Sequence, residues 1–203
     1  MESKTANLIK PTVFVTGTVP RIGVELLEAG GCTVSQWSSD VVIPRQEFLG
    51  RVKGIDALFC KLTEKIDAEL LDAAGPQLRV IGTMSVGYEH IDLKEIKNRK
   101  IVLGYTPDVL TDATAELTVA ILLASARRIL EAAHEVKSGG WGSWQPLWMC
   151  GKGLKESTVG VVGAGRIGQG VIDRLKPFKV SKFLYCNRNR NSEVEAKGPS
   201  TCH

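Results

Sequence analysis

Residues 158–168 constrain the fold of this chain more than any other stretch. They read Thr-Val-Gly-Val-Val-Gly-Ala-Gly-Arg-Ile-Gly, and the first five are largely apolar and β-branched, which is typical of a buried parallel strand. Gly163, Gly165 and Gly168 follow at the spacing G-x-G-x-x-G, and Ile167 begins a run of apolar residues at helical spacing. A strand, a glycine turn and a helix in this order predict a dinucleotide-binding unit. The alternative is a turn that merely tolerates glycine.

Each glycine of this motif has its own expected task. Gly163 makes the tight turn out of the strand, Gly165 lets the backbone approach a pyrophosphate, and Gly168 lets the helix pack on the strand. The free N–H groups and the positive dipole at the start of the helix then favour bound phosphates.

The turn after the next expected strand, residues 182–186, indicates which dinucleotide is bound. It reads Asn187-Arg188-Asn189-Arg190-Asn191, and no acidic residue occurs between residues 176 and 192. A site selective for NAD usually has Asp or Glu here to bind the ribose 2′-hydroxyl, whereas arginine suits a 2′-phosphate. The sequence therefore favours NADP(H), with NAD(H) bound more weakly. A solvated basic turn is the alternative.

Composition excludes several other classes of protein. The 203 residues are 43% apolar and 24% charged, as in ordinary globular proteins, and the net charge of +4 is spread along the chain. We therefore expect no nucleic-acid partner. The N-terminus has no apolar signal segment, and residues 117–126 are too few to cross a bilayer, so no membrane association is expected. Five scattered cysteines without C-x-x-C predict reduced thiols in a cytoplasmic protein and no metal site.

Residues 12–104 alternate short apolar strands with helices. The pattern predicts a doubly wound parallel α/β sheet, with ligands at the carboxyl ends of the strands. The expected strands are residues 12–16, 32–37, 57–61, 79–84 and 101–103, and the expected helices follow Pro20 and Pro44 or cover residues 68–74 and 93–98.

The middle and the end of the chain depart from this pattern. We expect one long helix over residues 112–137, followed by a segment, 141–153, with three tryptophans in eight residues and no regular period. That segment packs either on a partner subunit or on the chain's own domain seam. Residues 192–203 contain one large aliphatic residue, Val194, and predict a disordered tail. The second sheet would then stop after two strands, as in a truncated domain.

The turn at residues 84–92 is a candidate ligand site, because it follows a buried strand and contains Gly87. Its backbone N–H groups could bind a carboxylate, and an ordinary turn capped by Asp92 is the equal alternative. The three histidines are His90, His134 and His203, and none has neighbours that suggest an activated pair. We assign no catalytic residue.

Taken together, the motifs resemble the D-isomer-specific 2-hydroxyacid dehydrogenases. The resemblance runs from about residue 12 to residue 191, and in the segments 141–151 and 174–178 it is strongest toward the reductases of this family. It rests on Ser-Val-Gly-Tyr-Glu-His-Ile-Asp at 85–92, Tyr-Thr-Pro-Asp-Val-Leu-Thr-Asp at 105–112, Gly-Gly-Trp at 139–141 and Val-Gly-Ala-Gly-Arg-Ile-Gly at 162–168.

This resemblance implies two similar α/β domains and a cytoplasmic homodimer. A flavodoxin-like substrate domain would cover residues 1–110. An incomplete Rossmann NAD(P)-binding domain, with the long helix and a dimerisation loop, would cover residues 111–191. The disordered tail would cover residues 192–203.

By position in the motifs, the resemblance also implies site residues. The N–H groups of Val86 and Gly87 would hold the carboxylate of a small 2-oxoacid, and Trp144 would face a neighbour's cleft. The cofactor would be held at the pyrophosphate by Gly165, Arg166 and Ile167, between Gly163 and Gly168, and at the adenosine phosphate end by Arg188, Asn189, Arg190 and Asn191.

Family members carry a catalytic Arg, Glu and His in a region that we cannot match to this sequence. His203 follows no family motif. We therefore expect an enzyme by family, and little turnover from this chain, which the resemblance marks as C-terminally truncated. A non-catalytic dinucleotide-binding or interaction protein of the same fold is the alternative.

Overall fold

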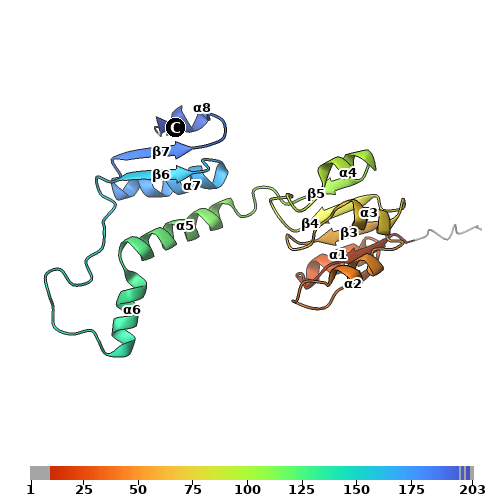
Figure 1. Cartoon of the computed structure of the whole chain (residues 1–203), viewed down its shortest axis with the longest axis horizontal. Helices are drawn as coiled ribbons and strands as arrows, with labels where there is room; N and C mark the ends of the chain where they lie inside the picture. The colour runs from red at the N-terminus through yellow and green to blue at the C-terminus, as the bar shows by residue number, and fades with distance from the viewer. Residues whose placement is uncertain (1–9, 197, 199, 202–203) are drawn as a thin grey trace, which may run out of the picture. The chain divides into compact units, whose positions relative to one another are not determined.

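The computed structural model describes residues 10–196, 198, 200 and 201. The chain divides into two compact units, Met1–Asp108 and Val109–His203 (Figure 1). Each unit has its own parallel sheet flanked by helices.

Unit 1 contains a five-stranded sheet in the order β2-β1-β3-β4-β5, and all neighbouring strands are parallel. This is the flavodoxin-like strand order, so the predicted doubly wound fold is confirmed. The elements of unit 1 are β1 (Thr12–Val15), α1 (Arg21–Ala29), β2 (Thr33–Gln36), α2 (Arg45–Arg51), β3 (Ala57–Cys60), α3 (Ala68–Ala74), β4 (Val80–Thr83), α4 (Leu93–Asn98) and β5 (Val102–Gly104).

The core of unit 1 lies where α2, α3 and α4 pack on the sheet. Phe14, Leu58 and Ile81, from three adjacent strands, are at most 1% exposed, and Phe48 and Leu71 join the same cluster from α2 and α3. Full burial of such a side chain contributes about 1.5–3 kcal/mol. Helix α1 has no buried residue. The core therefore fixes the strands whose carboxyl ends carry the candidate site.

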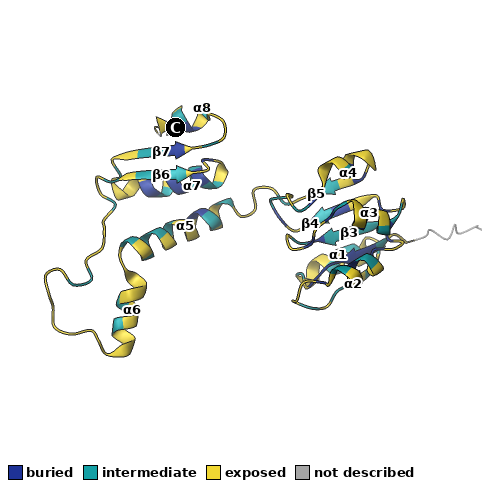
Figure 2. Cartoon of the chain, in the orientation of Figure 1, coloured by how far each residue is buried: buried dark blue, intermediate teal, exposed yellow. Residues whose placement is uncertain are grey.

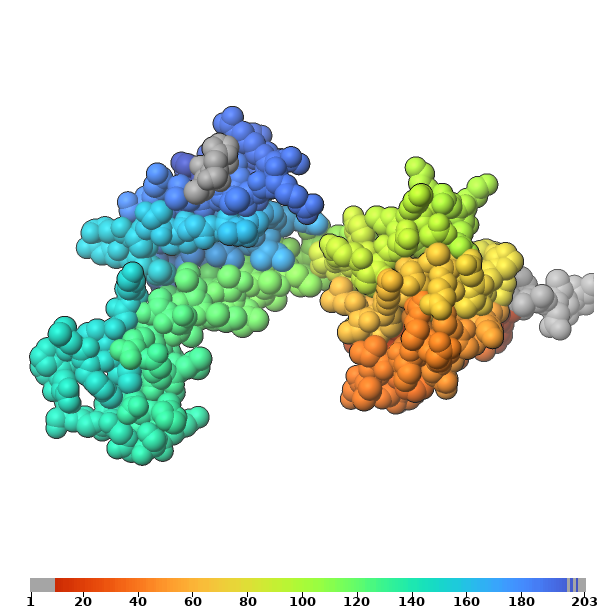
Figure 3. Space-filling model, viewed as in Figure 1, coloured from red at the N-terminus to blue at the C-terminus, as the bar shows by residue number. Residues whose placement is uncertain are grey.

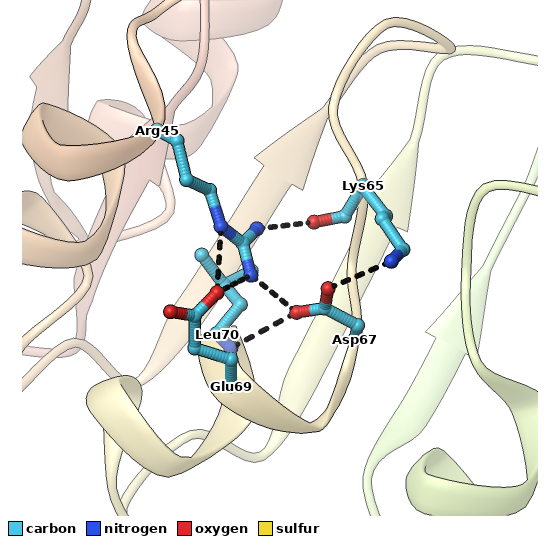
Figure 4. Close-up of polar contacts among 5 residues, drawn as sticks. All are labelled: Arg45, Lys65, Asp67, Glu69 and Leu70. Carbon is cyan, nitrogen blue, oxygen red and sulfur yellow. Dashed lines mark hydrogen bonds and ion pairs between the residues drawn. The ribbon is translucent and has the colours of Figure 1, made fainter.

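Aspartates start the two helices that follow β3 and β4. The side chain of Asp67 accepts a hydrogen bond from the N–H of Leu70, and Asp92 caps α4 in the same way. Figure 4 shows that Arg45 of α2 binds Asp67, the Glu69 carboxylate and the Lys65 carbonyl. Burial would raise the pKa of Asp67, but the hydrogen bonds from Arg45 and Leu70 lower it below its usual value. This cluster joins α2 to the start of α3.

Unit 2 contains a three-stranded parallel sheet in the order β6-β7-β8. Ala115 of α5 packs against Val171 and Leu175 of α7, and Arg174 pairs across these helices with Asp112 and Glu116. The elements are α5 (Thr111–Ala126), α6 (Ile129–Ser138), β6 (Thr158–Val162), α7 (Arg166–Leu175), the 3₁₀ helix η1 (Lys176–Phe178), β7 (Lys182–Cys186), α8 (Ser192–Ala196) and β8 (Ser200–Thr201).

The expectation of one long helix over residues 112–137 is wrong, because the helix breaks between α5 and α6. Arg128 adopts a left-handed conformation with φ 54°. The carbonyl of Ala126 accepts a hydrogen bond from the N–H of Lys152, which returns to this point from the far end of the following loop. Gly151 approaches Ala126 so closely that a side chain there would overlap the Ala126 carbonyl. A tertiary contact therefore ends α5.

The expectation of a disordered tail is also wrong for the described residues after 191. Residues 192–196 form α8, and Ser200 and Thr201 pair with β7 as a third parallel strand. Val194 is 1% exposed and clusters with Tyr185 and Ala164. The hydroxyl of Tyr185 also donates to the carboxylate of Glu195 at 2.8 Å. One buried aliphatic residue and one buried hydroxyl thus order this short helix against β7.

Burial differs strongly within unit 2. Figure 2 shows buried residues on β7 and α7, whereas α6 is exposed along most of its length, and α6 has no buried residue. In the space-filling view, α6 and the loop that follows it project from the rest of unit 2 (Figure 3). Leu130, Val136, Trp144 and Leu147 lie in this projecting part and are between 62% and 85% exposed.

The Asp67 cluster yields a test of stability in unit 1. Asp67→Ala removes both the cap of α3 and the partner of Arg45, and we expect it to lower the free energy of unfolding of unit 1 by about 1–2 kcal/mol. Asp67→Asn keeps a good capping residue and should cost less than half as much. Urea unfolding followed by amide exchange in β3 and β4 measures the loss. Equal losses in the two variants would contradict the separate capping role.

Candidate functional site

The glycine turn of unit 2 lies between β6 and α7. Gly163 has φ 90°, which favours glycine, and its N–H donates to the carbonyl of Cys186 at the end of β7. Ala164 is fully buried, and its N–H donates to Oδ1 of Asn187 at 2.7 Å. The backbone of the turn is thus tied to the carboxyl end of the neighbouring strand.

The other two glycines have different surroundings. A Cβ at Gly168 would overlap the carbonyl oxygen of Gly163, so only glycine allows α7 to lie this close to the turn. A Cβ at Gly165 would meet nothing within 4 Å. Gly165 is the residue just before α7, and no side chain caps this helix. The first N–H groups of a helix have no partner within that helix, and they attract anions. The first turn of α7, with Arg166 and Ile167, contains no acidic residue. This geometry suits a phosphate group.

The arginine turn follows β7, as the sequence predicts, but only part of it is available. Arg190 binds Glu195 of α8 through Nε and Nη2, at distances of 2.6–2.9 Å, and this carboxylate raises the pKa of Arg190. Asn191 accepts hydrogen bonds from the first N–H groups of α8. Arg188 has no hydrogen-bond or ion-pair partner within the described part of the chain. Arg188 and Asn189 are therefore the members of this turn that no observed contact occupies.

The second candidate site is the turn after β4 in unit 1. Its carbonyl groups are occupied: that of Ser85 accepts from the N–H of Thr106 at 2.9 Å, and that of Gly87 accepts from Ser85 Oγ at 2.6 Å. The N–H groups of Val86 and Gly87 have no acceptor among the residues that the structure describes. Both residues are half-buried. Unpaired N–H groups in such a place favour an anionic ligand.

Polar side chains lie beneath this turn, and sequence reasoning missed most of them. Thr83 Oγ1 lies 3.1 Å from His90 Nε2 and 2.7 Å from Ser85 Oγ. Burial lowers the pKa of His90, although the carboxylates of Glu64 and Glu89 act in the opposite direction. Burial also raises the pKa of the Cys60 thiol to about 12, so this thiol stays protonated at neutral pH.

Glu64 and Lys61 were not predicted as members of this edge of the sheet. Glu64 is 3% exposed and accepts hydrogen bonds from Thr16 Oγ1 and from the N–H of Lys61, both at 2.7 Å. The ammonium group of Lys61 lies against Gly17, just after β1. The one available signal was position, since both residues follow closely after the buried strand β3. Lys61 adds positive charge at the carboxyl ends of the strands.

The remaining candidate residues are Trp144, His134 and His203. Trp144 is 84% exposed, and Trp141 instead packs edge to face on Trp148 at 4.6 Å. His134 is exposed on α6, and His203 lies outside the described residues. Within the described ranges, no three His, Cys, Asp or Glu side chains are grouped so that they could hold a metal ion. None of the described helices is both long and apolar enough to cross a membrane.

A parallel sheet whose first strand leads through a glycine turn into a helix is the architecture of the dinucleotide-binding α/β proteins. In this chain it follows a flavodoxin-like unit that has its own candidate site. The chain belongs to the D-isomer specific 2-hydroxyacid dehydrogenase family, because the model of that family's catalytic domain matches residues 13–190. The predicted family is therefore confirmed, and it is a family of enzymes.

Individual relatives agree with this assignment. The chain is 55% identical over 195 residues to glyoxylate reductase/hydroxypyruvate reductase of Mus musculus, an alignment that covers 96% of this chain and 59% of the mouse protein. A Thermus thermophilus protein of known crystal structure is 37% identical in sequence, with a TM-score of 0.85. The match covers 94% of this chain and 59% of the Thermus chain. D-lactate dehydrogenase of Aquifex aeolicus, in complex with NAD and lactic acid, is 26% identical, with a TM-score of 0.78, over 94% of this chain and 55% of its own. The chain thus spans somewhat more than half the length of these relatives.

Two glycines of the turn yield a matched pair of predictions. Gly165→Ala should leave the stability of unit 2 unchanged, because its Cβ meets only open space, but should weaken NADP⁺ binding at least tenfold. Gly168→Ala should cost about 1–3 kcal/mol of stability, because α7 must move away from Gly163. Thermal unfolding and calorimetric titration measure the two effects. Unchanged NADP⁺ affinity in Gly165→Ala would contradict the proposed approach of the phosphates.

Proposed function

We propose that this chain is part of an NADPH-dependent reductase that converts glyoxylate to glycolate and hydroxypyruvate to D-glycerate. The observation that carries the proposal is that each unit has a turn whose backbone suits an anion, in a chain that is 55% identical to a glyoxylate reductase/hydroxypyruvate reductase. Residues 1–110 would form the substrate domain, and residues 111–191 would belong to the cofactor domain.

The turn after β4 would bind the substrate. The unpaired N–H groups of Val86 and Gly87 would donate to the carboxylate of the 2-oxoacid, and Lys61 would add favourable charge at the same edge of the sheet. Backbone donors recognise the carboxylate and not the rest of the molecule, which fits a class of small 2-oxoacids. Trp144 would contribute to the cleft of a neighbouring subunit.

The glycine turn would bind the pyrophosphate of the cofactor at Gly165, Arg166 and Ile167. The nicotinamide, when bound, supplies a hydride from C4 to the carbonyl carbon of the substrate, and the carbonyl oxygen takes up a proton. Arg188 would bind the 2′-phosphate, which supports NADPH over NADH. Arg190 would contribute less charge, since Glu195 already pairs with it.

We further propose that this chain alone turns over little substrate. Neither turn has a histidine paired with a carboxylate in the part of the chain that is described, because His90 binds Thr83 and His134 lies exposed on α6. General acid catalysis contributes about 10²–10⁴-fold to such reactions. A non-catalytic dinucleotide-binding protein of the same fold is the competing function.

A comparison of two arginine variants tests the cofactor assignment. Arg188→Ala should weaken NADPH binding about ten- to a hundredfold and leave NADH binding unchanged, because a charge-assisted hydrogen bond contributes about 1.5–3 kcal/mol. Arg190→Ala should have a smaller effect, and Arg21→Ala on α1 is the control. Fluorescence titration measures these affinities. Equal losses for NADPH and NADH would contradict the 2′-phosphate role.

The reductase activity itself is tested by NADPH oxidation at 340 nm with hydroxypyruvate, for this chain and for a chain of the full length of its relatives. We expect turnover in the longer protein and little in the 203 residues. NADPH binding without turnover in the longer protein would favour the non-catalytic alternative.

The exposed apolar residues of α5, α6 and the following loop support a homodimer. Ile121 and Leu130 border a hollow of about 560 Å³ between α5 and α6, and Leu130 is 76% exposed. Such contiguous apolar surface marks interfaces.

We expect Leu130→Asp to convert a dimer to monomers, measured by light scattering, whereas Leu26→Asp on α1 should not. A protein that is monomeric without substitution would contradict the proposal.

A further inference from the structure

Three short contacts beneath the turn after β4 form a continuous line of hydrogen bonds. His90 Nε2 lies 3.1 Å from Thr83 Oγ1, Thr83 Oγ1 lies 2.7 Å from Ser85 Oγ, and Ser85 Oγ lies 2.6 Å from the carbonyl oxygen of Gly87. Thr83 is 1% exposed and Ser85 is 5% exposed, so water does not replace these partners. The line therefore leads from a ring nitrogen to the backbone of the proposed carboxylate site.

The number of protons determines the direction of every bond in this line. A carbonyl oxygen only accepts, so the hydroxyl of Ser85 donates to Gly87. Each hydroxyl has one proton, so Thr83 must donate to Ser85, and the oxygen of Thr83 must accept from His90. His90 Nε2 therefore carries a proton. With the opposite tautomer, the 2.7 Å contact between the two hydroxyl oxygens would contain no proton.

Burial favours a neutral His90 ring, although the charges around it do not. The thiol of Cys60, 3.9 Å from Nε2, is protonated at neutral pH, and the carboxylates of Glu64 and Glu89 are the charges that act on the ring. Burial outweighs both carboxylates and lowers the pKa of His90.

The last bond of the line closes a ring that contains the backbone of Val86 and Gly87. Gly87 would otherwise have the broad conformational freedom of glycine. Ordering a residue costs conformational entropy, and a site that is ordered before the ligand arrives does not lose this on binding. The carbonyl of Ser85 is meanwhile held by the N–H of Thr106, and because the peptide is trans the N–H of Val86 points the opposite way.

We propose that the line from His90 through Thr83 and Ser85 to Gly87 orders the turn for carboxylate binding, which makes these three side chains positioning residues. The proposal rests on the proposed function in one respect, namely that this turn binds the substrate carboxylate. His90 acts in it through its Nε2 proton, and it transfers no proton to the substrate.

The first part of the test leaves all four residues of the line unchanged. A two-bond ¹H–¹⁵N spectrum of the full chain labelled at histidine reports which ring nitrogen of His90 carries the proton, with the other two signals assigned by their loss in His134→Asn and His203→Asn. We expect the Nε2–H form at pH 7.5. The Nδ1–H form would overturn the proposal, because the direction of the line would then be impossible.

The second part measures hydroxypyruvate binding through the amide signals of Val86 and Gly87. Thr83→Val should weaken binding about tenfold, whereas Thr83→Ser, which keeps the hydroxyl, should bind like the unmodified chain. Ser85→Ala removes the hydrogen bond to the Gly87 carbonyl and should also weaken binding about tenfold. This second variant tests the proposal even if Thr83→Val does not fold. Ser35→Ala in β2 removes a serine hydroxyl that lies near the carbonyl of Val13 in β1, and it is the matched control.

The outcomes separate positioning from stability and from the proposed function. Folded Thr83→Val and Ser85→Ala chains with lower stability but unchanged affinity would overturn the positioning role. If hydroxypyruvate shifts neither amide signal in the unmodified chain, although the Nε2–H form is present, the turn is no carboxylate site, and the positioning role falls with it.

Discussion

The contact between Gly168 and the carbonyl of Gly163 is the constraint on which the cofactor side of this chain depends. It holds the first turn of α7 against the end of β6, so that the N–H groups at the start of the helix lie beside an open Gly165. Any side chain at position 168 would separate helix and turn. Because Gly163 also needs a positive φ, two of the three glycines are required by the protein itself, and Gly165 alone is left for the ligand.

Unit 1 uses the same physical device without a long helix. In its turn after β4, the carbonyl groups of Ser85 and Gly87 accept hydrogen bonds from Thr106 and Ser85. Two N–H groups of the turn stay unpaired within the described part of the chain. Both units therefore present backbone donors at the carboxyl ends of parallel strands. Backbone donors suit anions of simple shape, such as a phosphate or a carboxylate, and Lys61 after β3 and Arg188 after β7 add positive charge at the carboxyl ends of the strands. The mild net charge of +4 is thus less informative than where these two side chains lie.

Sequence reasoning predicted the elements that depend on local pattern and missed those that depend on tertiary contacts. The β6–α7 unit and the doubly wound parallel sheet of unit 1 follow from apolar periodicity and glycine spacing. The break before α6 does not, because two arginines are good helix formers and the break is caused by the return of Gly151 and Lys152. Helix α8 was missed because its polar composition hides the burial of Val194 against Tyr185. The partners of His90 were missed because nothing in the sequence shows that Thr83 lies beneath the turn.

Amide chemical shifts of the full ¹⁵N-labelled chain test whether the two turns bind two different anions. NADP⁺ and hydroxypyruvate would be added separately. We expect NADP⁺ to shift the amides of residues 163–168 and 187–190, and hydroxypyruvate to shift those of residues 85–87. If NADP⁺ shifts the amides of neither the glycine turn nor the arginine turn, the glycine turn is not a cofactor site.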